Sequence, residues 1–334
     1  MSLPTRPLGT TGLEITTVGL GAWAIGGGGW AFGWGPQDDE DSLAAMRRSV
    51  ELGINWIDTA AVYGHGHSEE VVGRFLEELP PEDRPYVFTK CGLVWDEREP
   101  GSEASRILRP DSIRREMEAS LRRLGVEHVD LYQIHWPAED GTPPEESWEA
   151  MVRLVEEGKA GAIGVSNYDV ALLRQCEAVR HVDSLQPEFS LLRRDTGSDE
   201  IAWCDAHGTG VIVYSPMGSG LLTDSFSRER VARMAEDDWR RRSARFQDPD
   251  LGRILALRNA LGPVAERHGA SVADVAVAWT LAWPGVSGAI VGARSAEQVD
   301  GWIGAATLAL GDADLDEIAA AIRRSGAGEG PTRP

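Results

Sequence analysis

Eight short apolar runs alternate with helix-patterned segments along this chain, and this alternation limits the available folds more than any other feature. Continuous apolar runs of this length, without a polar residue at every second position, are typical of parallel strands buried on both faces. We therefore expect a mostly parallel sheet covered by helices. The runs are residues 17–23, 56–60, 86–92, 129–135, 162–166, 184–189, 211–215 and 289–291.

The segments between the runs carry helical periodicity. They are residues 39–52, 68–79, 111–124, 145–157, 170–178 and 199–207, then 251–283, which we expect to hold two helices, a helix after the eighth run with Ser295 as its N-cap, and 314–322. Eight strand–helix units in 334 residues predict a closed (β/α)8 TIM barrel, with a doubly wound open sheet as the alternative. Because no internal repeat or linker interrupts the pattern, we expect a single domain over residues 1–334.

Two segments depart from the alternation. Residues 8–13, with their Gly-Thr-Thr-Gly turn, predict a short N-terminal hairpin ahead of the barrel. Residues 220–250, after the seventh run, are rich in charge and too long for an ordinary connection. We interpret this long insertion as a functional loop or lid, with a solvated helical insertion as the alternative.

The charge balance excludes some partners. With 33 basic and 53 acidic side chains the formal net charge is −20, which argues against nucleic acid or an anionic membrane surface as a partner. The three scattered cysteines form no CxxC pair, so we expect neither a disulfide framework nor a metal site. The chain has no leader-type start and no apolar run long enough to span a bilayer, which favours a cytoplasmic protein. A homo-oligomer is compatible with the sequence.

Polar, titratable residues stand at the ends of successive runs, where barrel enzymes place their active sites. Asp58 and Tyr63 follow the second run, Lys90 ends the third and His135 ends the fourth. A phenol needs a neighbouring cation to act as an acid or base near neutral pH. We therefore expect Lys90 to lower the pKa of Tyr63, Asp58 to keep the ammonium charged, and His135 to orient a carbonyl oxygen.

Each of these residues, taken singly, has a structural explanation as a cap, an ion pair or a packing group. Lys90 is the most informative, because every other basic residue except Lys159 is arginine. The four together predict a proton-transfer site. The usual dinucleotide, phosphate-loop and nucleophile-elbow motifs are missing. Instead Gly292, Ala293, Arg294 and Gln298 open the helix after the eighth run, a place where a barrel can bind phosphate.

Several stretches together resemble the aldo-keto reductases over nearly the whole chain. They are VGLGAWAIGG, GINWIDTAAVYGHGHSEEVVG, VFTKCG, VDLYQIHWP, GKAGAIGVSNY, SLQPEFSLL, VIVYSPMGSGLLT and VGARSAEQV. The EDDWRRRSARFQ stretch of the insertion further resembles bacterial members near the general stress and inositol-cluster reductases and the potassium-channel β subunits. The resemblance implies a (β/α)8 barrel that binds NADP(H) without a Rossmann domain and reduces a small-molecule aldehyde or ketone by hydride transfer.

By this resemblance, Tyr63 is the general acid, Asp58 and Lys90 tune it, and His135 assists at the carbonyl. Many relatives have Glu-Asn where this chain has Gly301 and Trp302, so the adenine contact made by that Asn is not carried over. The cofactor-binding residues implied are Gly21, Ala22, Trp23, Asp58, Ser166, Asn167, Gln186, Tyr214, Ser215, Pro216, Met217, Gly218, Ser219, Gly220, Leu221, Gly292, Ala293, Arg294 and Gln298.

Aromatic residues crowd the first loop and the rim, and we interpret them as the wall of a pocket for a cyclic or sugar-like carbonyl compound, with ordinary packing as the alternative. The expected pocket residues are Trp23, Trp30, Phe32, Trp34, Tyr63, Trp95, His135 and Trp136. Two other functions stay open. One is an NADPH-binding regulatory module with little turnover, similar to the channel β subunits, and the other is a Schiff-base aldolase that uses Lys90.

Overall fold

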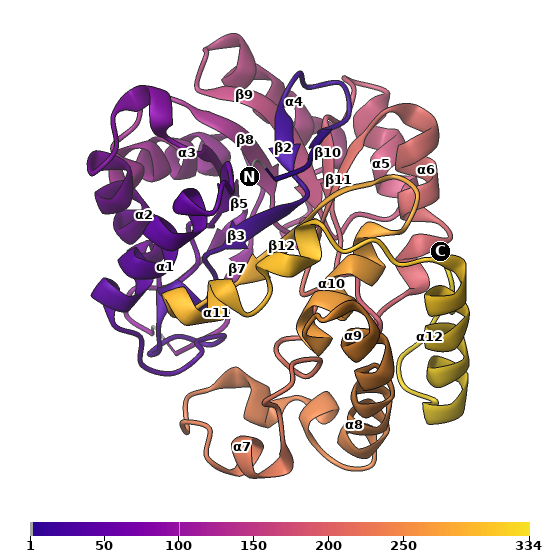
Figure 1. Ribbon diagram of the computed structural model, residues 1–334. Helices are drawn as coiled ribbons and strands as arrows, with labels where there is room; N and C mark the ends of the chain where they lie inside the picture. The colour runs from indigo at the N-terminus through magenta and orange to yellow at the C-terminus, as the bar shows by residue number, and fades with distance from the viewer. Residues whose placement is uncertain (1–2, 100) are drawn as a thin grey trace.

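Eight parallel strands close into a barrel in the computed structural model, which describes residues 3–99 and 101–334 (Figure 1). The order around the barrel is β10-β11-β12-β3-β4-β5-β8-β9, so the open-sheet alternative is excluded. Each of the eight expected runs forms one barrel strand. These are β3 (Val18–Gly21), β4 (Trp56–Asp58), β5 (Tyr86–Cys91), β8 (Val129–Ile134), β9 (Ala160–Ser166), β10 (Ser184–Gln186), β11 (Gly210–Tyr214) and β12 (Val286–Gly292).

Helices cover the outside of the barrel close to the positions that the periodicity predicts, except for the short α7, which belongs to the long insertion. They are α1 (Asp39–Glu51), α2 (His67–Glu77), α3 (Pro110–Leu124), α4 (Pro144–Glu156), α5 (Val170–Glu177), α6 (Glu200–His207), α7 (Arg228–Ala232), α8 (Asp250–Ala260), α9 (Gly262–His268), α10 (Val272–Leu281), α11 (Ala296–Asp300) and α12 (Asp312–Ser325).

The structure corrects two details of the helix prediction. Residues 251–283 hold parts of three helices rather than two, because the chain breaks at Leu261, ahead of Pro263 in the first turn of α9, as well as at the left-handed Gly269. Helix α11 does follow Ser295, but the hydroxyl of Ser295 makes no capping hydrogen bond. The side chain of Gln298 accepts the hydrogen bond from the backbone N–H of Arg294 instead (3.0 Å).

The expected N-terminal hairpin lies across one end of the barrel. Strands β1 (Thr5–Pro7) and β2 (Glu14–Thr16) pair antiparallel, and Leu8 and Ile15 pack against side chains that point into the barrel from its strands. Trp56 fills much of this interior. A Cβ atom at Gly19 would lie 2.1 Å from the Trp56 indole, so only glycine fits there. Apolar side chains thus fill the barrel at this end, and the polar residues of the candidate site lie at the opposite end.

Side chains alternate between the two faces of each barrel strand, and this alternation determines which polar side chains point into the barrel at its rim. The interior apolar layer includes Trp56 on β4, Phe88 on β5 and Leu131 on β8. Alternate residues of a strand point to the same side, so Asp58 and Lys90, two positions further along β4 and β5, also point into the barrel. An apolar layer therefore supports a polar one at the carboxyl ends of the strands.

Connections after two strands build the walls above this rim. A small hairpin of β6 (Leu93–Val94) and β7 (Ser105–Arg106) follows β5. The long insertion after β11 carries α7 and short helical turns, and extends below the barrel in Figure 1 (orange). Its Trp239 backbone N–H donates to the Gly33 carbonyl in the loop between β3 and α1 (3.1 Å). Among the described residues, no helix is both long and apolar enough to span a membrane.

Glu116 on α3 fixes the backbone just after Lys90, and it generates a pH-dependent prediction. Its carboxylate accepts hydrogen bonds from the Gly92 N–H (2.8 Å) and the Ser112 hydroxyl (3.1 Å), while burial raises the pKa of Glu116 to about 7. A carboxyl group whose pKa is raised by folding costs stability as the pH rises from about 4.5 to about 7.

Glu116→Gln should therefore raise the free energy of unfolding by ~2 kcal/mol relative to wild type at pH 8 and leave it almost unchanged at pH 4.5, as measured by urea denaturation. An equal difference at both pH values would contradict this.

Candidate active site

A buried ion pair lies at the centre of the rim. The Lys90 ammonium donates to the Asp58 carboxylate (2.5 Å) and to the Thr59 carbonyl (2.8 Å), and its side chain is 0% exposed. Burial of both charges removes their hydration, so the pair depends on its mutual attraction and on further hydrogen bonds. Because strands β4 and β5 are neighbours in the barrel, these two residues meet although they are far apart in the sequence.

Two glutamines complete the surroundings of Asp58. Gln186 and Gln133 both donate to Asp58 Oδ2, at 2.9 and 3.3 Å. Gln133 was missed in the sequence, although it stands at an inward position of β8 between Leu131 and His135. A polar residue at an inward position of an otherwise apolar strand is the signal that identifies it. The Asp58 carboxylate is thus satisfied on both oxygens.

Tyr63 lies between this pair and His135. Its hydroxyl is 3.5 Å from Lys90 Nζ, and its ring centroid is 5.6 Å from that of His135, edge to face. The expectation that Lys90 lowers the pKa of the phenol is wrong for this structure: burial and the Asp58 charge hold the pKa of Tyr63 well above its usual value. Burial, with the Lys90 charge, lowers the pKa of His135 well below its usual value. At neutral pH the phenol therefore keeps its proton, and the imidazole carries no charge.

Asn167 and Tyr214 form a second polar group on the rim, next to His135. Asn167 Nδ2 donates to the His135 carbonyl (3.1 Å), and the Tyr214 hydroxyl donates to Asn167 Oδ1 (2.9 Å). Asn167 has a left-handed backbone (φ 62°), which turns the chain sharply after β9. The Ser166 hydroxyl donates to the Gln186 carbonyl (2.8 Å), which joins β9 to β10. The barrel therefore brings these predicted residues together beside Tyr63 and His135.

A cavity of about 970 Å³ runs along this rim, in the size range of ligand sites. Most of the predicted site residues line it, from strands at opposite sides of the barrel. They are Gly21, Trp23, Trp30, Phe32, Trp34, Asp58, Tyr63, His135, Trp136, Ser166, Asn167, Gln186, Tyr214, Ser215, Pro216, Met217, Ser219, Gly220, Gly292, Ala293, Arg294 and Gln298.

Five predicted residues do not line this cavity. Lys90 lies behind Asp58 and Tyr63, and Ala22 and Leu221 are buried in the core. A side chain at Gly218 would point at Leu192, away from the cavity. Trp95 lines a separate outer hollow and stacks on His65 (ring centroids 5.1 Å apart). The prediction that Trp95 lines the substrate pocket is therefore wrong.

The two ends of the cavity differ in character. Trp30 and His65 form part of an aromatic wall near Tyr63, and Trp30 lies 6.2 Å from Tyr63 between ring centroids. At the other end the wall includes Arg294 and, from the long insertion, Arg230 and Arg240. Three arginines therefore line this end in a strongly acidic protein, and one of them, Arg240, is paired with Asp238 (2.6 Å).

Sequence reasoning also missed part of these walls. Among the lining residues that were not predicted are Gln37, His65, Arg230 and Arg240. The charge-rich insertion was interpreted as a functional loop or lid, but none of its arginines was predicted to line the site. Trp302 also contributes, and among the described residues its buried indole N–H has no hydrogen-bond partner.

The fold, the polar rim and the long cavity define a (β/α)8-barrel oxidoreductase. A family model described as the Aldo/keto reductase family matches residues 18–323. The chain belongs to this family. Its members use nicotinamide cofactors and act on small-molecule carbonyl substrates.

Named relatives match the chain over most of its length. "Aldo-keto reductase YhdN" of Bacillus subtilis is 34% identical over 80% of this chain and 79% of its own length. "NADH-specific methylglyoxal reductase" of Escherichia coli is also 34% identical, over 95% of this chain and 99% of its own. A solved glycerol dehydrogenase from Gluconobacter oxydans superposes with a TM-score of 0.86 at 35% identity, covering 99% of this chain and 98% of that one.

The ion pair generates a prediction about stability. Removing one member of a buried pair leaves an uncompensated charge, so Asp58→Ala should lower the free energy of unfolding by about 3–5 kcal/mol. Lys90→Met is the second single variant. The double variant should lose less free energy of unfolding than the two single variants lose together. Denaturant titrations of the four proteins measure this cycle, and strict additivity would contradict the coupling.

Proposed function

We propose that this protein is an NADPH-dependent reductase that converts an aldehyde or ketone to the alcohol, with Tyr63 as general acid. One observation carries the proposal: the protonated Tyr63 phenol and the neutral His135 imidazole both line the cavity, with the Asp58–Lys90 pair directly behind the phenol. When bound, the nicotinamide supplies the hydride. The remaining steps fall to the chain's own residues.

Proton transfer follows from the charges around Tyr63. Its raised pKa keeps the phenol protonated at neutral pH, as a proton donor to a carbonyl oxygen must be. Transfer leaves a phenolate, whose negative charge lies 3.5 Å from the Lys90 ammonium and is stabilised there. His135, uncharged at neutral pH, orients the carbonyl by a hydrogen bond and does not compete for the proton.

The cavity fits the dimensions and the charge of an extended dinucleotide. Ser166, Asn167 and Gln186 would hold the carboxamide, and the Tyr214 ring would stack on the nicotinamide. The turn from Ser215 to Gly220 has left-handed residues at Ser215, Gly218, Ser219 and Gly220, and such turns form concavities that bind anions. Arg294 at the far end supports a preference for NADPH through the 2′-phosphate. Because the Escherichia coli relative is named NADH-specific, assays with both cofactors test this preference.

The substrate end supports a hydroxylated carbonyl compound, such as a sugar derivative. Trp30 and Trp136 offer apolar faces, and Arg106, which stacks on Trp136 (4.6 Å to the ring centroid), adds a polar rim with Glu139. The names of the relatives, a methylglyoxal reductase and a glycerol dehydrogenase, agree with small, oxygen-rich substrates.

The two rival functions make different demands. A Schiff base needs a neutral amine that reaches the substrate, whereas Lys90 is 0% exposed, lies outside the cavity lining and is paired with Asp58. A regulatory module would bind NADPH with almost no turnover. A screen of carbonyl compounds that follows NADPH and NADH oxidation in parallel separates that module from a reductase.

Removal of the phenol hydroxyl tests the proposed acid. Tyr63→Phe should lower kcat for carbonyl reduction by about 10²–10⁴-fold, because the general acid is lost while the ring and its packing remain. NADPH binding, measured by fluorescence titration, should stay within about twofold of wild type. Turnover comparable to that of wild type would show that another group is the acid.

A second prediction tests the aromatic wall. Trp30→Ala should raise KM by about tenfold for a sugar-like substrate and by much less for a small aldehyde, since only the larger compound reaches the indole. Trp203→Ala, which removes an indole from α6, serves as the matched control, because Trp203 stacks on His207 and does not line the cavity. Equal effects of Trp30→Ala on both substrates would contradict an aromatic subsite.

A further inference from the structure

The loop between β3 and α1, residues 22–38, spans both ends of the cavity. Trp30 and Phe32 line the substrate end, and Gln37 lies near the arginines of the other end. Gly27, Gly29 and Gly35 within this loop have positive φ angles of 69°, 82° and 78°. A loop so rich in glycine loses much conformational freedom when it is ordered, so its closed form needs external attachments.

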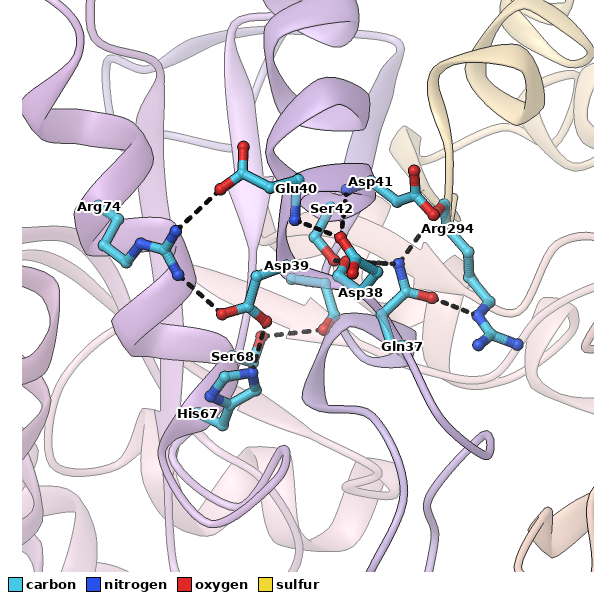
Figure 2. A network of polar contacts seen from close by, with 11 residues as sticks. Gln37, Asp38, Asp39, Glu40, Asp41, Ser42, His67, Ser68, Arg74 and Arg294 are labelled. Atoms are coloured by element: carbon cyan, nitrogen blue, oxygen red, sulfur yellow. Dashed lines mark hydrogen bonds and ion pairs between the residues drawn. The ribbon is translucent and has the colours of Figure 1, made fainter.

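Arg294 provides an attachment at the end of β12. Its Nε donates to Gln37 Oε1 (2.6 Å), its Nη1 donates to the Trp34 carbonyl (3.3 Å), and its Nη2 donates to the Pro36 carbonyl. Gln37 Nε2 donates in return to the Arg294 backbone carbonyl (3.0 Å). Figure 2 shows Gln37 between Arg294 and the first turn of α1. Side chain and backbone of Arg294 are therefore both tied to the loop.

We propose that the Arg294–Gln37 pair is a latch that holds the β3–α1 loop closed over the substrate end, so that Gln37 is a positioning residue for the aromatic wall. All three nitrogens of the guanidinium donate to the loop without any cofactor. Of its five N–H groups the latch uses three, which leaves two for a phosphate. The residue proposed to recognise the 2′-phosphate thus also shapes the site where substrate binds.

The first turn of α1 gives the latch a rigid base. The Asp38 carboxylate caps α1 by accepting from the Glu40 N–H (2.8 Å), and Gln37 Nε2 also donates to the Ser42 hydroxyl (3.0 Å). Asp39 pairs with His67 and Arg74 of α2 (Figure 2). The loop is therefore held between a fixed helix end and the end of β12.

The long insertion holds the same loop from its other side. The Trp239 N–H donates to the Gly33 carbonyl (3.1 Å), and the Gly29 N–H donates to Asp237 (3.3 Å). The Arg240 guanidinium lies over the Trp34 ring, 4.3 Å from its centroid. The Gly29 and Gly33 contacts lie toward the tip of the loop, and the Arg240 contact lies at Trp34, next to the carbonyl that Arg294 binds. Arg294 adds the attachment at Pro36 and Gln37, where the loop returns to α1, and its release should loosen the loop from that side.

Hydrogen exchange of the cofactor-free protein tests the latch directly. Arg294→Ala and Gln37→Ala should each increase the exchange rate of the 24–38 segment by about tenfold, because each removes the attachment from one side. Gln37→Glu keeps the acceptor for Arg294 Nε but loses the Nε2 donor to the Arg294 carbonyl, so its exchange rate should fall between those of wild type and Gln37→Ala. Arg48→Ala is the matched control: it breaks an ion pair between α1 and Asp300 of α11 away from the loop (2.7 Å) and should leave the segment unchanged. Wild-type exchange in both alanine variants would overturn the proposal.

Kinetics with NADH separate the latch from phosphate recognition, and this second arm rests on the proposed function. NADH has no 2′-phosphate, so an Arg294 that served the phosphate alone would leave NADH kinetics unchanged on substitution. We expect Arg294→Ala and Gln37→Ala, each with saturating NADH, to raise the KM for a sugar-like substrate by about fivefold, with a larger change in KM than in kcat. An unchanged KM would overturn the latch. If wild type turns over no carbonyl with either cofactor, the proposed function fails, whereas the exchange experiment still decides the latch.

Discussion

The charge of one buried lysine governs the arrangement of the rim. Lys90 carries its ammonium into a place without water, and this costs free energy unless partners surround it. Asp58 provides the counter-charge, and the Thr59 carbonyl accepts a further hydrogen bond. Gln133 and Gln186 in turn satisfy the carboxylate. Residues from four strands are therefore fixed relative to one another before any ligand enters, and Tyr63 is fixed beside them.

This arrangement explains how one side of the cavity can be chemically active while the fold stays stable. The apolar layer of Trp56, Phe88 and Leu131 lies directly below the polar one and excludes water from it. A low-polarity environment keeps the Tyr63 proton in place and keeps His135 uncharged. The phenol pKa is raised rather than lowered because burial and the Asp58 charge dominate, although the Lys90 ammonium at 3.5 Å favours the phenolate.

The β3–α1 loop and the long insertion, which lie over the barrel end, are held by other interactions than the buried ion pair. The β3–α1 loop and the long insertion pack on each other through Trp23, Trp34 and Trp239, and arginines attach the loop further: Arg294 from β12, with Arg240 over Trp34. A guanidinium suits this task because its planar set of donors can bind several carbonyl groups at once. In a protein with a net charge of −20, three arginines, Arg230, Arg240 and Arg294, line this end of the cavity.

The sequence by itself determined the barrel, its eight strands and the four residues proposed for proton transfer. The reason is that strand periodicity and strand ends are local properties, and the ends of parallel strands meet at one rim. The tertiary structure decided what depends on contacts across the barrel. In the folded chain Gln133 donates to Asp58, and Arg294 donates to Gln37. Trp95 lies outside the pocket, and burial raises the pKa of Tyr63. Such contacts join residues far apart in the chain, so their partners and their burial are known only once the chain is folded.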